Sequence, residues 1–257
     1  MKPFVRQWAA IVVSGIFLLM VMAPIKADAQ SSSAKTIAVL YFENNSVVDK
    51  DKLDPLKKGL ADMMITELSK IKSLRVVERR HIQSIIDELN LNETDMVDKS
   101  TTQKMGKLLG AEVMLFGGFS NLFKDQLRID VRIVRTETGE TLKADEETGE
   151  LDEFLPMLQS LVKKIAKDLD VKLSSSEEDQ LEAKNEGKFS GYVKYAQALN
   201  YEDQGRTLEK NGKNSEAKTA YENAKTLFQK AVDESEGYEP AKQKAEEMAV
   251  LISKLKK

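Results

Sequence analysis

The sequence predicts an α/β domain, a mixed sheet flanked by helices, followed by an all-α region. Residues 35–172 mix β-rich apolar runs with apolar stripes at helical spacing. From about Leu181 to Lys257 the chain is rich in Ala, Glu and Lys, which predicts helices throughout. Residues 173–186 read as a polar linker, in which Ser174 could instead cap the next helix. The helical domain is expected over 187–257.

The first strand and helix follow from an unbroken apolar run and a capping pair. Residues 36–42 are almost continuously apolar, as expected of a strand covered on both faces. Asp54 and Pro55 then suit the N-cap and first position of a helix. The helix carries a stripe of large apolar residues at helical spacing, namely Leu56, Leu60, Met63, Met64 and Leu68.

A short strand over 74–79 and two further helices come next. The helix predicted over 81–91 places isoleucines on one face, and the helix predicted over 102–109 ends at Gly110, a favoured residue after a helix. His81 begins the first of these helices. It has no second His or nucleophile beside it in the sequence, so we interpret it as a surface residue.

Three strands and a helix complete the α/β domain. Strand signals cover 113–119 and 127–133, and a turn at 138–140 leads into a more polar edge strand over 141–144. The last helix has Pro156 in its first turn and an apolar face. The adjacent Gly117 and Gly118 predict a bulge or a close backbone approach within a strand.

The first thirty residues resemble a secretory signal peptide. Lys2 and Arg6 precede an apolar run from Trp8 to Met22, and Ala27 and Ala29 form an A-x-A cleavage site. We expect cleavage after Ala29, so that the mature chain begins at Gln30; an uncleaved anchor is the alternative. Removal leaves 39 − 3 = 36 basic and 42 − 1 = 41 acidic residues, a net charge of −5.

The composition argues against most enzyme classes. The chain has one His and no Cys, which leaves little material for a zinc site, a catalytic triad or a thiol nucleophile. A net charge of −3 gives no support to nucleic-acid binding. We therefore expect a non-enzymatic protein with no cofactor or metal.

Three phrases in order carry a resemblance to a known family. They are KTIAVLYFEN, LRVVERRHIQSIIDELNL, and MGKLLGAEVMLFGGF followed by LRIDVRIVRTETGET. Over roughly residues 35–170 the chain resembles the CsgG-like family, named for the curli secretion component of the outer membrane. The resemblance implies a sheet-and-helix fold akin to anticodon-binding domains. It also implies that Glu78 and Arg79, which match the family's Glu-Arg phrase, form a structural turn or a subunit contact.

Two departures from the curli channel bear on function. That channel is a lipoprotein, and this chain has no Cys to lipidate. It also builds its barrel from two long inserted hairpins, whereas the loops around residues 123–126 and 138–139 are short. The alternation of Leu127 to Ile133 is assigned to the core of the domain. We expect a channel relative without the pore.

The tail carries a pattern that resembles a tetratricopeptide repeat. Ala224, Phe228 and Ala231 have the spacing of small and aromatic residues on the second helix of such a repeat, and Pro240 follows. Only one copy is visible, so a plain three-helix bundle remains an equal alternative. Either arrangement predicts a protein-interaction module.

These observations together predict a periplasmic accessory protein for the assembly or export of cell-surface material. It would act through contacts of its helical tail with envelope proteins. The alternatives are a regulator that activates a peptidoglycan synthase, as other proteins with this domain do, and an oligomeric outer-membrane pore. Homo-oligomerisation and direct contact with the outer membrane are left open.

Overall fold

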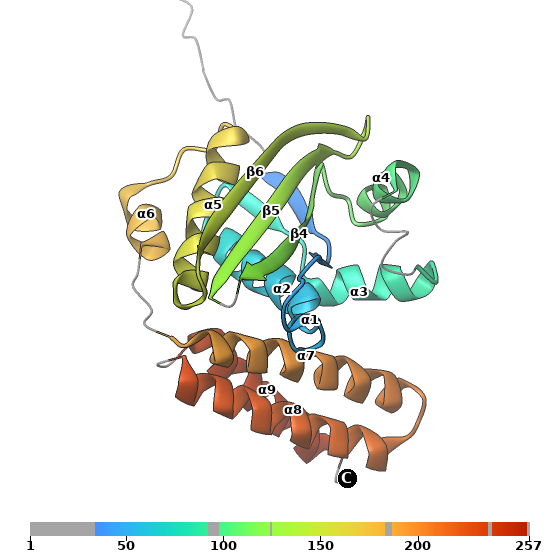
Figure 1. Cartoon of the computed structure of the whole chain (residues 1–257). Coiled ribbons are helices and arrows are strands. Elements are labelled where there is room, and N and C mark those ends of the chain that lie inside the picture. Colours follow the sequence, from blue (N-terminus) through green and yellow to red (C-terminus); the bar gives the residue numbers. More distant parts are fainter. Residues whose placement is uncertain (1–33, 92–97, 124, 183–186, 236–237, 256–257) are drawn as a thin grey trace, which may run out of the picture. The chain divides into compact units, whose positions relative to one another are not determined.

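The first part of the chain forms a six-stranded mixed sheet (Figure 1). The computed structural model describes residues 34–91, 98–123, 125–182, 187–235 and 238–255. The strand order is β3-β1-β4-β5-β6, and β2 pairs with β4. The strands are β1 (Lys35–Val39), β2 (Glu43–Asn44), β3 (Leu74–Val76), β4 (Val113–Phe123), β5 (Gln126–Arg135) and β6 (Glu140–Glu150). The α/β prediction is thereby confirmed.

The sheet is parallel in its first half and antiparallel in its second. Strand β1 runs parallel to both β3 and β4, as expected for strands linked through helices. Strands β4, β5 and β6 are consecutive and antiparallel. Strand β6 is an edge strand, as the polar sequence predicts, but it extends through the acidic residues 145–150, well beyond the expected 141–144.

Helices α2 and α5 cover one face of this sheet. The helices of the sheet region are α1 (Lys50–Leu53), α2 (Leu56–Leu68), α3 (Arg79–Glu88), α4 (Lys99–Leu108) and α5 (Phe154–Asp168), with a 3-10 turn, η2 (Leu151–Glu153), before α5. The alternating apolar residues of β5 are buried against this side, which agrees with their assignment to the core: Leu127, Ile129, Val131 and Ile133. The predicted stripes of α2 and α5 are buried as well.

Helix ends differ from the sequence predictions for local reasons. Pro55, expected at the first position of α2, is its N-cap, and Asp54 ends α1, because α1 leads into α2 without an extended residue. Helix α4 starts three residues early because the Asp98 side chain accepts hydrogen bonds from the N–H groups of Ser100 (2.9 Å) and Thr101 (3.2 Å). Gly110 follows α4 with φ +62°, as predicted.

The segment predicted as a linker contains a helix, α6 (Ser175–Leu181). Ser174 caps it, in agreement with the second interpretation of this segment, and forms a capping box with Glu177. Backbone N–H groups of Ser174 and Lys72 donate to the Glu177 carboxylate and lower its pKa to about 2. The segment is therefore tied to the sheet region at Lys72.

Three helices form the tail: α7 (Phe189–Lys210), α8 (Asn214–Glu234) and α9 (Glu239–Lys254). Helix α8 begins at Asn214, with Lys213 as its N-cap and no side-chain capping hydrogen bond. The predicted packing residues Ala224, Phe228 and Ala231 are buried in α8. The Phe228 ring lies 5.4 Å from that of Tyr195 in α7, between ring centroids.

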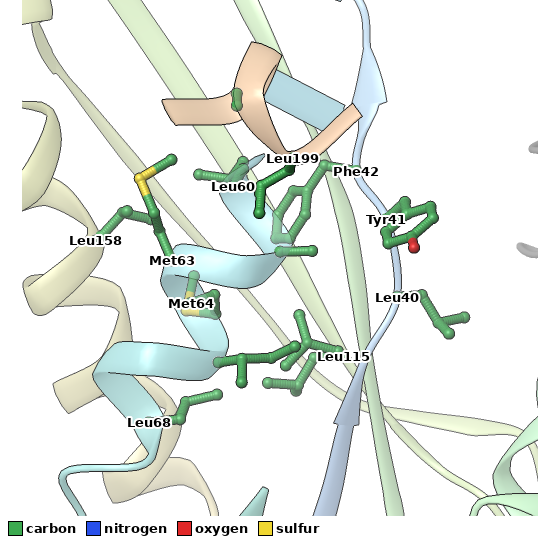
Figure 2. Packing of buried hydrophobic residues seen from close by; sticks show 14 of the residues in the cluster. Leu40, Tyr41, Phe42, Leu60, Met63, Met64, Leu68, Leu115, Leu158 and Leu199 are labelled. Carbon is green, nitrogen blue, oxygen red and sulfur yellow. The ribbon is translucent and has the colours of Figure 1, made fainter. Parts of the chain in front are cut away.

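The tail shares its apolar core with the sheet region (Figure 2). Leu199 of α7 lies beside Phe42 and Leu60 in the close view of this core. Gly59 of α2 allows α7 to approach closely, since a Cβ added there would lie 2.4 Å from the Cβ of Ala196. The sheet region and the tail belong to one compact unit. No helix in the described ranges is long and apolar enough to cross a membrane.

Candidate functional site

A buried charge cluster joins the sheet region to the tail, and Arg79 lies at its centre. Arg79 is the first residue of α3 and is only 2% exposed. Its Nε donates to Asp62 Oδ1 of α2 (3.0 Å), and its Nη1 donates to both carboxylate oxygens of Asp203 of α7 (2.9 Å each). Glu202 Oε2, also of α7, lies 3.7 Å from Arg79 Nη2. We call these residues, with Lys58, Tyr195, Arg206, Lys244 and Glu247, the junction cluster.

The remaining members complete the charge balance around Arg79. Lys58 pairs with Asp203 (2.8 Å), and the Tyr195 hydroxyl donates to Asp62. Glu202, fully buried, pairs with Arg206 (2.9 Å) and with Lys244 of α9 (3.0 Å). Arg206 and the exposed Arg80 both pair with Glu247 of α9 (2.7 and 3.0 Å). Helices α2, α3, α7 and α9 are thus tied together by ion pairs.

The pKa shifts of Arg79, Asp203 and Glu202 in the junction cluster favour the charged forms of these three groups. Burial by itself lowers the pKa of Arg79, but Asp203 and Asp62 outweigh it and raise that pKa above its ordinary value. Burial raises the pKa of Asp203 and Glu202, yet their neighbouring cations lower both below the usual range. Burial, together with the Asp62 carboxylate, raises the pKa of Tyr195. The phenol therefore stays protonated and donates.

Three of the residues singled out from the sequence meet at the junction. A cavity of about 210 Å³ at its surface is lined by Glu78, Arg79 and Pro240, among others. Glu78 is the exposed N-cap of α3, and Pro240 lies in the first turn of α9. Arg79 makes its contacts inside the chain. The predicted cleavage site, Ala27, Ala29 and Gln30, lies outside the described residues.

The partners of Arg79 were not predicted from the sequence. Asp62 and Glu202 were not singled out, although an acidic residue on an otherwise apolar helix face is a usable signal, because such a group needs a partner. Asp62 stands between Ala61 and Met63 on the buried stripe of α2. Within the described ranges, no group of three or more metal-ligating side chains lies close enough together to hold an ion.

Comparison with known proteins identifies one domain. The family model described as "Curli production assembly/transport component CsgG" matches residues 19–122. The chain therefore contains a CsgG-like domain, as the sequence phrases predict. The matched range ends within β4, short of the expected limit near residue 170, and leaves β5, β6 and the helical tail outside it. No curated protein matches the chain.

Among solved structures, the chain is similar to the C-terminal domain of LpoB from Salmonella enterica, with 13% identity, 46% of this chain and 84% of that chain covered, and a TM-score of 0.32. It is similar to the C-terminal domain of LpoB from Escherichia coli, with 12% identity, coverage of 46% and 83%, and a TM-score of 0.34. It is also similar to the lipoprotein GNA1162 from Neisseria meningitidis, with 15% identity, coverage of 53% and 98%, and a TM-score of 0.37.

Proposed function

We propose that this protein is a non-enzymatic accessory protein of the cell envelope, which works through protein contacts in the assembly or export of cell-surface material. The observation that carries the proposal is the CsgG-like domain at residues 19–122. The signal-like first thirty residues support an exported, periplasmic location, with cleavage after Ala29.

The junction cluster supports a structural role for the buried ionisable groups. Asp62, Glu202 and Asp203 are each engaged by cations or hydroxyl groups of the same chain. A group that serves acid–base catalysis needs access to a substrate, and these carboxylates are used inside the molecule. The tail is fixed to the sheet region by these contacts, so the two regions would present partners with one rigid surface.

Localisation is the first test of this proposal. The full-length chain, tagged at its C-terminus, is expressed in its own host. Cell fractionation then gives its location, and intact-mass measurement gives its first residue. We expect a periplasmic or envelope-associated protein whose mass corresponds to a start at Gln30. Recovery of the uncleaved chain in the cytoplasm would overturn the proposal.

Partner capture from envelope extract separates the candidate roles. Co-purification of surface-fibre or secretion components favours the assembly role. Recovery of a peptidoglycan synthase instead favours the alternative of a synthase regulator. Light scattering with and without detergent addresses the third possibility, because a large closed ring that is stable only in detergent would favour an oligomeric pore.

A further inference from the structure

The described helices leave one face of the antiparallel half of the sheet uncovered. In Figure 1 strands β4, β5 and β6 lie in front of α2 and α5, and none of the described helices crosses their near face. Helix α4 covers only one end, where Gly106 lies against Thr136 and Met114. A cavity of about 900 Å³ lies on this face, lined by the three strands, α4 and residues near β2. We call it the sheet hollow.

Two arginines of β5 line the sheet hollow, and they differ in their ion pairs. Arg128 is neutralised twice, by Asp130 (2.7 Å between Nη2 and Oδ1) and by Glu146 of β6. Arg132 points to the same face and is exposed. Its guanidinium has no ion pair or hydrogen bond among the described residues. Lys99 of α4, which lies over the turn at Gly139, lines the same end. Lys99 likewise forms no ion pair among the described residues, whereas Glu43 and Asp145 add acidic residues to the lining of the hollow.

Apolar surface lies on both sides of Arg132. Register pairs it with Phe116 of β4 and with Ala144 of β6. Phe116 is only half-buried although it belongs to the central strand, and Gly118, the next residue of β4 on this face, has no side chain that could cover it. An arginine beside an aromatic ring in a recess is the composition typical of the energetically dominant residues of protein interfaces.

We propose that the sheet hollow binds an acidic segment of a partner protein. A carboxylate of the segment accepts two hydrogen bonds from the Arg132 guanidinium, with Lys99 nearby, and an apolar neighbour packs on Phe116 and Ala144. The inference rests on the proposed function, which requires a protein partner. Antiparallel sheets often leave one face in water, but here Asp130 and Glu146 both pair with Arg128 and leave Arg132 on the same face without an ion pair among the described residues.

Site-specific cross-linking in the host cell tests this proposal. The photoreactive residue p-benzoylphenylalanine replaces Ala144 in the full-length chain, and the cross-linked partner peptide is identified by mass spectrometry. We expect a segment with Asp or Glu next to the cross-linked residue. In the Arg132→Glu background the yield should fall about tenfold or more, because the charge now repels the carboxylate. Arg132→Lys should retain part of the yield, since the charge remains but the bidentate geometry is lost.

Arg75→Glu is the matched control. Arg75 is an exposed arginine of β3, at the opposite edge of the sheet, and its reversal should leave the yield unchanged. An unchanged urea midpoint for Arg132→Glu shows that the fold is intact. The proposal is overturned if the segment lacks acidic residues, if it comes from a second copy of this chain, if the cross-link survives Arg132→Glu, or if none forms. A cytoplasmic acidic partner would overturn the proposed function and leave the binding preference of the hollow standing.

Discussion

The junction cluster and the sheet hollow show two ways in which one protein uses arginine. Arg79 is 2% exposed and lies among three carboxylates of its own chain, and its ion pairs with them hold helices together. Arg132 is exposed, and Asp130 and Glu146, which line the same hollow, pair with Arg128 instead. A buried arginine that is paired with carboxylates of its own chain typically serves the structure. An exposed arginine without an ion pair is free to bind a carboxylate of a partner.

The largest effect is expected from Arg79→Ala. Removal of one partner leaves Asp62 and Asp203 buried beside fewer cations, and breaking a buried ion pair in this way costs about 3–5 kcal/mol. Urea unfolding of the purified chain measures the loss. Arg80→Ala is the control, because Arg80 is 49% exposed and its pair with Glu247 should contribute less than about 1 kcal/mol. Equal losses for the two variants would contradict the central role of Arg79.

The close approach of α2 and α7 should be nearly as sensitive. Gly59→Val places side-chain atoms where Ala196 already lies, and overpacking of this kind costs about 1–3 kcal/mol. Because Ala196→Gly reopens the space, the double variant should recover part of the loss. If the double variant is no more stable than Gly59→Val alone, the two helices do not approach each other at this point.

A smaller effect is expected from Tyr195→Phe. The change removes the hydroxyl that donates to Asp62, and a hydrogen bond to a charged group contributes about 1.5 kcal/mol when the acceptor keeps another partner, here Arg79. Tyr192→Phe is a close control, since the buried Tyr192 hydroxyl has no hydrogen-bond partner in the described part of the chain. Its loss should be neutral or slightly stabilising. The difference in urea midpoint between the two variants measures the hydrogen bond.

Acidification should weaken the junction. The pKa values of Asp203 and Glu202 are lower in the folded chain than their ordinary values of 3.8 and 4.5. The unfolded chain therefore binds more protons in this window, and stability rises with pH there. The contribution is complete above about pH 5 and is lost as the pH falls through the folded pKa values. In Arg79→Ala the urea midpoint should depend less steeply on pH between about 5 and 3, because the main source of the shift in Asp203 is gone.

The fold was predictable where local pattern decided it. The buried faces follow from the alternation of apolar residues in β5 and from the apolar stripes of α2 and α5. These faces are buried in the structure. Strand β2 escaped prediction because two residues carry no periodicity; it exists through its pairing with Gly118 and Phe119 of β4. Helix α1 was not predicted for the same reason, since its four residues are too few to show a periodicity.

The site was predictable only in part. Arg79 was singled out by resemblance, but its partner Asp203 lies 124 residues further along the chain. No local spacing links the two, since their meeting depends on how α7 docks on α2. The open face of the sheet likewise depends on which helices pack on which side. The alternation of Arg128, Asp130 and Arg132 shows only that they share a face.

The smallest stability effect should come from Arg132→Ala. An exposed side chain without an ion pair contributes little to folding, and its removal should change the free energy of unfolding by no more than about 0.5 kcal/mol. The same variant should lose most of the cross-linking through position 144, so stability and partner contact separate at this residue. A loss of stability comparable to that of Arg79→Ala would mean that Arg132 serves the fold. The contrast between the two arginines would then be lost, and with it the reason to assign the sheet hollow to a partner.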